Sequence, residues 1–494
     1  MATINMPAPE KNFDTADPLP SEEYVEKAMP SILGSFDMTV VYVMIIFFIT
    51  NATTAIAGGA ATFTYWILGA ITFFIPCAIA TAQLGVMFQH EGSLYNWTHK
   101  ALGGYWSFFV AFCAWFPGVL LMVAGADTVV TYLMGLNPNW FSQIWQQGVA
   151  VIALLTICCI ITLQPFRTVQ NMANVMFGII LLTVIIVGVA GVAWFVGKHP
   201  SATSFSHPSD WWLTPTNFVV FGAITHAYLG VAVPMNMGGE ILGRKVITRH
   251  LLWGTMIVIT AYLVTTFTLL AIQGKAATGT LFSVVTVVDM GLNKFFGDIT
   301  AICVIGFFLM APVVYNYSYA RLLLVGGIDK RLPVSVGRLN KYRIPAHAIV
   351  FQTVVAILLA AGVYLVVPLF TRLGNPADLT NEVYNVMLAS STLVWAISTA
   401  FLFINLVKFY LMDRHAFRKQ RIFPMPVLWI SIVFGVVACA LSIIDTLYFS
   451  WVPQQIDNSH WWYIIGGLTL VCVIIAAFGA MLASSEAAWQ DFSK

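Results

Sequence analysis

The stretch that decides the fold is "ITHAYLGVAVPMNMGGE", residues 224–240. It follows an apolar run, yet it contains His226, Gly230 and Pro234, each of which weakens a helix or carries polarity that lipid tolerates only at a cost. Non-helical backbone at membrane depth is tolerated only where it is buried in protein or lines a cavity. The stretch therefore predicts a broken membrane helix.

The composition of the whole chain supports a membrane environment. Of 494 residues, 59% are hydrophobic and only 9% are charged, whereas soluble domains carry about 25% charged residues. Apolar runs of about 20 residues favour helices, because barrel strands would alternate apolar and polar residues. We expect an all-α polytopic membrane protein with membrane lipid around it. The net charge of +2 gives no indication of a nucleic-acid partner.

Motifs for enzymatic chemistry or cofactor binding are missing from the sequence. It contains no phosphate-binding glycine-rich loop, no His-Glu-x-x-His and no nucleophile elbow. The seven cysteines lie in apolar runs without metal-ligand spacing. The sequence therefore predicts neither an enzyme nor a cofactor or metal site.

Apolar runs between turn and charge signals predict twelve membrane spans. All but four of the 23 Lys and Arg residues (Lys198, Lys275, Lys294 and Arg372) fall on one side if the N-terminus is cytoplasmic. The positive-inside rule then places both termini in the cytoplasm. We also expect a plasma-membrane protein whose short N-terminal tail is disordered. The predicted spans are 37–60, 64–87, 105–134, 147–163, 169–196, 216–235, 250–272, 293–323, 346–368, 382–411, 425–448 and 461–483, and the connections 197–215 and 273–292 have room for small interfacial helices.

A second interrupted segment lies five spans before the first. The 37–60 span contains "FFITNATTAIAGGA" (47–60), in which polar residues precede a Gly58-Gly59 pair. Two polar, glycine-interrupted segments at corresponding positions of two halves indicate a transporter site near the midplane. The alternative is that glycine and polar residues only mediate helix packing, as they often do in membranes.

Two longer motifs resemble the amino acid–polyamine–organocation permeases. "AQLGVMFQHEGSLYNWTHKALGGYW" (82–106) is similar to their helix 2–loop–helix 3 signature, and "ARLLLVGGIDKRLPVSVGRLNKYRIPAHAI" (320–349) to the stretch after helix 8. The resemblance implies the five-plus-five inverted-repeat fold shared with the bacterial leucine transporter, with helices 1 and 6 unwound. The implied parts are a cytoplasmic tail (1–35), two five-helix repeats (36–196 and 216–411), helices 11 and 12 (425–483) and a second tail (484–494).

The sequence also departs from the pattern of this family. Gln83 replaces the acid of helix 2, the Pro-x-x-Gly-Gly turn becomes residues 89–93, and Ala232 replaces the acid of helix 6. The segment 174–180 is apolar except for Asn174, so the lysine that some proton-coupled relatives carry on helix 5 is missing. These departures leave the coupling ion open.

The candidate substrate-binding residues surround the two breaks, with additions that rest on analogy to the family. Backbone and hydroxyl groups near the first break would bind a substrate carboxylate, and Tyr228 would act as a gate. Helix packing is the alternative role for each of these residues. The predicted set is Phe48, Thr50, Asn51, Thr53, Thr54, Trp115, His226, Ala227, Tyr228, Leu229, Gly230, Tyr315, Asn316, Ser391 and Trp395.

Three residues are candidates for gating or coupling. His226 would tune the response to pH, because the charge of a histidine changes between pH 5 and 8; its alternative is a neutral buried side chain. Glu240, beside Arg244 in the sequence, would form a cytoplasmic gate salt bridge. The acids Asp127, Asp298 and Asp445 are expected near helix ends that water reaches, which weakens their claim to function.

These observations predict a secondary active transporter, a permease or exchanger for amino acids or close derivatives, that works by alternating access. Its partners would be an amino acid-like substrate and a coupling ion or a counter-substrate. A polyamine or organic-cation transporter is the first alternative, although the breaks carry no carboxylate. A nutrient receptor or a channel on the same fold is the second.

Overall fold

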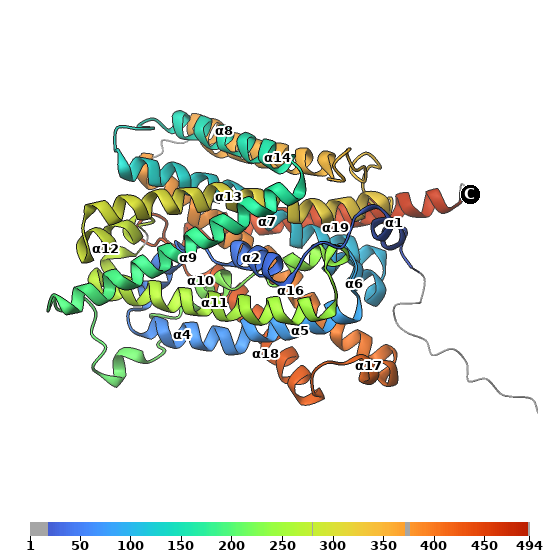
Figure 1. Cartoon of the computed structure of the whole chain (residues 1–494), viewed down its shortest axis with the longest axis horizontal. Helices are drawn as coiled ribbons and strands as arrows, with labels where there is room; N and C mark the ends of the chain where they lie inside the picture. Colours follow the sequence, from blue (N-terminus) through green and yellow to red (C-terminus); the bar gives the residue numbers. More distant parts are fainter. Residues whose placement is uncertain (1–17, 279, 371–375, 493–494) are drawn as a thin grey trace, which may run out of the picture.

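The computed structural model describes residues 18–278, 280–370 and 376–492, and these ranges are almost wholly helical (Figure 1). Within them, ten helices are long and apolar enough to cross a membrane. A further pair, Ser35–Ile46 and Asn51–Gly58, passes the same test jointly and is bent by 45°. The prediction of an all-α polytopic membrane protein is confirmed.

The helices follow the predicted spans closely. The first span is split into α2 (Ser35–Ile46), α3 (Asn51–Ala55) and the 3₁₀ turn η2 (Ile56–Gly58). The sixth is reduced to α10 (Val219–Ala227) and the 3₁₀ turns η5 (Val233–Asn236) and η6 (Gly238–Glu240). The other spans are α4 (Ala61–Gly69) with η3 (Ala70–Phe74) and α5 (Ile75–Met87), α7 (Gly104–Leu136), α8 (Ile144–Thr162), α9 (Phe166–Val196), α11 (Arg244–Ile272), α13 (Lys294–Ile328), α14 (Ala346–Ala361) with η8 (Gly362–Val366) and α15 (Val367–Phe370), α16 (Pro376–Met412), α18 (Met425–Tyr448) and α19 (Asn458–Phe492).

Short helices occupy the connections. The two connections that have room for small helices, 197–215 and 273–292, contain η4 (Pro208–Trp211), η7 (Gly274–Ala277) and α12 (Ser283–Gly291). The sequence analysis did not predict α6 (Ser93–Leu102) or α17 (Arg414–Gln420) as helices. Both tails also differ from expectation where they are described: α1 (Pro20–Ala28) packs on the bundle, and α19 extends to Phe492. Arg372, one of the four basic residues expected outside, lies beyond the described residues.

The bundle has a buried centre and lipid-accessible flanks. In α7 and α16, 78% of the most apolar window is buried, whereas in α19 only 22% is. The exposed helices carry large apolar side chains on their outer faces, which is the surface that a bilayer requires. The broken elements α2, α3 and α10 therefore lie inside a shell of continuous helices, where unpaired backbone is protected from lipid.

The two ends of the bundle are clearly distinguished in Figure 1. At one end, here named the α1 end, lie α1, α6, α17 and the C-terminus. At the opposite end, the α12 end, lie α12 and the connection that contains η4. The long membrane helices run between these two ends, and the broken elements α2 and α10 lie between them.

Candidate functional site

The first break separates α2 from α3 over residues 47–50. The backbone leaves the helical conformation at Phe47 (φ −87°, ψ 100°). Tyrosine hydroxyls from neighbouring helices satisfy the freed backbone groups: Tyr262 on α11 donates to Ile46 O at 2.9 Å and accepts from Phe48 N at 3.2 Å. Tyr315 on α13 donates to Ile45 O. Unpaired backbone groups are costly in a membrane, so these tyrosines hold the break in this conformation.

The polar side chains of the break join the same hydrogen-bond network. Thr50 Oγ1 lies 2.7 Å from the hydroxyl of Tyr384 on α16, and that hydroxyl donates to Asn51 Oδ1 at 3.2 Å. Asn51 Nδ2 in turn donates to Tyr262 at 3.2 Å. The hydroxyl of Thr53 donates to the carbonyl oxygen of Thr50 at 2.8 Å. The side chains of three predicted residues thus form hydrogen bonds with other protein groups in this conformation.

The second break follows α10 and has a left-handed residue at its centre. Tyr228 ends the helix (φ −104°, ψ 0°), and Gly230 has φ +100°, a conformation that residues with a Cβ rarely adopt. A Cβ added to Gly230 would lie 3.0 Å from Ile45 Cγ2 and 3.0 Å from Trp395 Cη2. The two broken helices therefore meet at Gly230, and α16 closes the contact from the other side.

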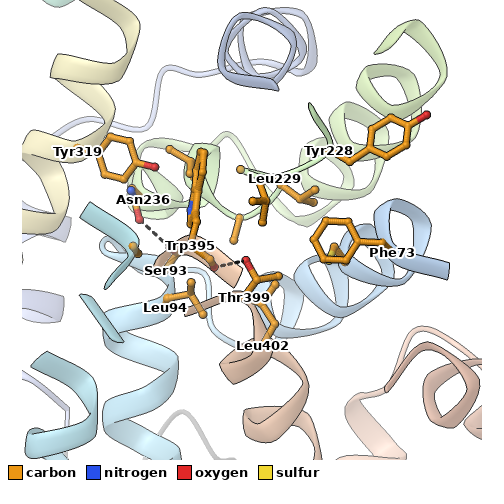
Figure 2. Close-up of a pocket in the computed structure, with 16 residues that line it drawn as sticks. Phe73, Ser93, Leu94, Tyr228, Leu229, Asn236, Tyr319, Trp395, Thr399 and Leu402 are labelled. Atoms are coloured by element: carbon orange, nitrogen blue, oxygen red, sulfur yellow. Dashed lines mark hydrogen bonds between the residues drawn. The ribbon is translucent and has the colours of Figure 1, made fainter. Parts of the chain in front are cut away.

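A small cavity lies beside the second break (Figure 2). Its volume is about 20 Å³, enough for about one water molecule. Figure 2 shows Asn236 and Tyr319 on one side and Phe73 on the other, with Trp395 between them. The structure is thus closed around the site. The lining residues are Phe73, Cys77, Ser93, Leu94, Ala114, Tyr228, Leu229, Gly230, Val231, Ala232, Val233, Asn236, Tyr319, Trp395, Thr399 and Leu402.

The structure gathers part of the predicted site around the two breaks. Tyr228, Leu229, Gly230 and Trp395 line the cavity. The ring of Phe48 packs against Tyr315, with centroids 6.0 Å apart, beside the first break. Ala227 is buried at the end of α10. These residues remain candidates for substrate contact.

Other predicted residues face different neighbours. Trp115 Nε1 donates to Gln352 on α14 at 3.1 Å, and Asn316 Nδ2 donates to Thr353 at 3.0 Å, so both are directed to the contact with α14. The remaining three are engaged elsewhere: Ser391 donates to Leu388 O at 2.7 Å, His226 Nδ1 lies 2.8 Å from Thr392 Oγ1, and Thr54 lines a separate pocket of about 210 Å³ with Lys275.

The sequence analysis missed the polar part of the cavity lining. Ser93 donates to Asn236 Oδ1 at 2.7 Å, as Figure 2 shows, and thereby connects α6 to the turn after the second break. Ser93 lies at the second glycine position of the family's turn, so this substitution was the available signal. Tyr319 and Thr399 gave no comparable signal, because only packing brings them to the break.

Glu240 forms a different ion pair from the predicted one. Its carboxylate pairs with Arg321 on α13, through Nε at 2.8 Å and Nη2 at 3.4 Å, and both side chains are buried. Arg244, the expected partner, begins α11 and is exposed. The prediction failed because Glu240 lies on a 3₁₀ turn that directs its side chain into the bundle, whereas Arg244 lies beyond that turn, at the exposed start of α11.

A second acid lies against the same turn. Glu91 Oε2 accepts the backbone N–H of Gly239 at 2.8 Å, and the side chain is buried. Burial and the nearby Glu240 carboxylate raise the pKa of Glu91 well above its ordinary value. The α1 end of the broken helix is therefore held by two acids and one arginine.

The N-terminal segment 18–34 lies against the turn that carries Glu240. The backbone amides of Ile32 and Leu33 both donate to Glu240 O at 2.9 Å. Ser21 donates to Asp329 through its amide and its hydroxyl, at 2.9 and 3.0 Å. Burial raises the pKa of Asp329 to about 6. The segment 18–34 thus acts as a latch across the α1 end of the broken helix.

Of the three acids that were expected near water, only one is accessible to it. Asp298 is partly exposed and pairs with Lys294 at 3.0 Å, so it is within reach of water as expected. Asp127 and Asp445 are completely buried, which contradicts the expectation. Asp445 Oδ2 accepts the N–H of Gly222 in the first turn of α10 at 2.7 Å. This contact fixes Asp445 at the first turn of α10, while its Oδ1 has no hydrogen-bond partner among the described residues.

Comparisons with known proteins agree with this architecture. A family model described as amino acid permease matches residues 33–478. An uncharacterized transporter of Legionella pneumophila is 22% identical over 345 residues, which are 66% of this chain and 72% of that protein. A probable agmatine/putrescine antiporter of Lactococcus lactis is 32% identical over 75 residues, 15% of this chain and 16% of that protein. The family match runs from just before α2 into α19.

Proposed function

Because the chain belongs to the amino acid permease family, we propose that it is a secondary active transporter of amino acids or close derivatives. It alternates access to one site between the two faces of the membrane, and that site lies where the two broken helices meet. The two inverted five-helix repeats expected from the sequence provide the symmetry for this exchange.

The observation that carries the proposal is the contact between the breaks at Gly230. Backbone groups at both breaks are buried inside the bundle, away from lipid. At the first break the hydroxyls of Tyr262 and Tyr315 donate to backbone carbonyls, a role that a substrate amine can take over. Tyr262 also accepts from the N–H of Phe48, a role that a substrate carboxylate can take over. A cavity of about 20 Å³ is too small for an amino acid, so this conformation must open before a substrate enters.

The substrate class follows from the cavity lining. Among the described residues that line it, none is Asp, Glu, Lys, Arg or His. A dication at this depth is neutralised only by buried carboxylates, and the lining has none; aromatic rings do line the cavity, but they attract a cation without cancelling its charge. A zwitterion is neutral overall, and backbone dipoles at half-helix ends are sufficient to bind its two charged groups.

A polyamine is the second candidate, since one relative is named a probable agmatine/putrescine antiporter. That match covers only 75 residues, and the neutral lining opposes the assignment. A receptor or channel on the same fold would bind solutes without accumulating them.

The proposed orientation places the α1 end in the cytoplasm of the plasma membrane. The basic distribution of the loops supports this assignment, because Lys100 on α6 and Arg414 on α17 belong to the α1 end. A protease site inserted within α17 should be cleaved only from the cytoplasmic side, and one inserted beside Asp210 only from outside. Cleavage of both from one side would overturn this topology.

Transport is tested with purified protein in proteoliposomes. We expect uptake from a mixture of radiolabelled amino acids, and little uptake of agmatine or putrescine. A thermal-shift screen of the same solutes measures binding separately, because a ligand that binds only the folded state stabilises it. Binding without uptake would favour a receptor, and preference for putrescine would favour the polyamine alternative.

A further inference from the structure

Asp127 is a buried acid for which the site described above has no use. It lies on α7, in the third of the helix nearest the α12 end, and its side chain is 0% exposed. The Tyr364 hydroxyl donates to Oδ1, whereas Oδ2 has no hydrogen-bond partner among the described residues. No basic residue in the described part of the chain pairs with it.

An unpaired carboxylate in this position is unfavourable. Burying a charge without a partner is costly, above all at membrane depth. The neutral form removes this cost by taking up a proton. In the closed conformation Asp127 therefore holds a proton, and its free Oδ2 is the oxygen available to carry it.

A local irregularity positions the tyrosine that faces Asp127. Tyr364 lies in the π-helical turn η8 at the end of α14. Such turns in membrane and soluble helices are frequent at functional sites. Gly148 on α8 packs against this tyrosine so closely that an added Cβ would lie 2.5 Å from Tyr364 Cβ. The hydroxyl is thus fixed in place against the carboxyl.

The groups around Asp127 connect it to the first break. The titratable group that contacts Asp127 is Tyr364 from η8, and Tyr384 lies on α16, the helix that packs along α7. Glu382, also on α16, lines an apolar pocket between α7, α14, α16 and α19. Tyr384 is hydrogen-bonded to Thr50 at 2.7 Å. A change in the charge of Asp127 therefore acts on the tyrosine that holds the break.

A metal ion fits this position less well than a proton. Hard cations such as Ca²⁺ take six or more oxygen ligands, and even small ones require several. The described residues contain no group of three or more His, Cys, Asp or Glu that could hold a metal ion. The recorded hydrogen-bond partner of Asp127 is one hydroxyl, that of Tyr364, which is fewer oxygens than such a cation requires.

We propose that Asp127 is the binding site of the proton that drives transport. The inference rests on the proposed function and deepens it by naming the coupling ion. Loss of the proton leaves a charge that the closed packing cannot satisfy, so release requires α7, α14 and α16 to rearrange and admit water or new donors. Through Tyr384 and Thr50, this rearrangement changes the support of the first break, which links proton release to opening of the site.

Infrared spectroscopy of the protein in lipid tests the proton without any substrate. A protonated carboxylic acid has a C=O stretch distinct from that of a carboxylate. We expect wild type to show intensity in this band that Asp127→Asn loses and that the control Asp298→Asn, which removes a partly exposed acid, retains. Tyr364→Phe should shift the band without removing it. An unchanged band in both Asp127→Asn and Tyr364→Phe would overturn the proposal.

Proteoliposomes loaded at a different internal pH test the coupling. With one proton per substrate, a gradient of about one pH unit sustains about tenfold accumulation of the radiolabelled amino acid mixture. We expect Asp127→Asn to lose this accumulation and to keep exchange against internal amino acids, whereas Asp298→Asn accumulates normally. Accumulation by Asp127→Asn equal to wild type would overturn the proposal, as would accumulation driven by sodium alone. If wild type takes up no amino acid, the proposed function fails, and the infrared result still decides the protonation of Asp127.

Discussion

Replacing Gly230 with alanine tests whether the two broken helices must meet for the site to close. The φ of Gly230, +100°, imposes strain on any residue with a Cβ, and the added atom would press on Ile45 and Trp395 at 3.0 Å. Strain of this kind costs about 1–3 kcal/mol, and overpacking adds about 1–3 kcal/mol. We expect Gly230→Ala to destabilise the closed conformation by about 2–6 kcal/mol relative to open ones.

Cys77 provides a local reporter of this change. It lines the cavity and is 1% exposed, so a thiol reagent reaches it only when the site opens. When opening and closing are fast relative to the labelling reaction, the labelling rate is proportional to the fraction of open molecules. The lower limit of 2 kcal/mol corresponds to an increase of about 30-fold in the open fraction and hence in the rate of Cys77 labelling. Cys77→Ser supplies the background from the other six cysteines.

Gly243→Ala is the matched control. Gly243 also has a positive φ, +131°, but no heavy atom lies within 4 Å of its added Cβ. This variant carries the backbone strain without the contact, and its Cys77 labelling should stay near the wild-type rate. Equal labelling of the two variants would refute the conclusion that contact with Ile45 and Trp395 closes the site. Loss of folded protein in Gly230→Ala alone would show that the closed conformation is needed for stability.

Three further predictions concern the charged and titratable groups. Glu240→Gln should increase opening toward the α1 end and therefore speed up hydrogen exchange of the backbone amide of Arg321. Unchanged exchange would show that the ion pair does not hold this end closed. His226→Gln should keep the pH dependence of transport, because glutamine can still form a hydrogen bond with Thr392. A flattened pH profile would instead assign proton coupling to His226, as the sequence analysis proposed, and not to Asp127. The folded protein should resist thermal unfolding better at pH 5 than at pH 7.5 through Asp329: the folded-state pKa of this acid, about 6, exceeds its ordinary value of 3.8, so it contributes more stability to the folded state as pH falls through 6. Asp329→Asn should abolish this dependence.

The positions of the membrane helices and of both breaks were determined by the sequence itself. Long apolar runs must become helices in lipid, because only a helix satisfies its own backbone there. Glycine, proline and polar residues at 47–60 and 224–240 then mark where that rule is relaxed. These signals are local, so they can be read without knowing what lies beside them. The resemblance to a permease family rests on equally local motifs.

Partners distant in the sequence were decided only by the tertiary structure. Glu240 pairs with Arg321, 81 residues away, rather than with Arg244, because a 3₁₀ turn directs its side chain into the bundle. Asp127 was expected near water and is buried, because α14 and α16 cover it, and its tyrosine partner lies 237 residues away. Helical spacing shows which residues share a face, but the environment of that face depends on the neighbouring helix. The charge state of a buried acid is therefore a property of the packing.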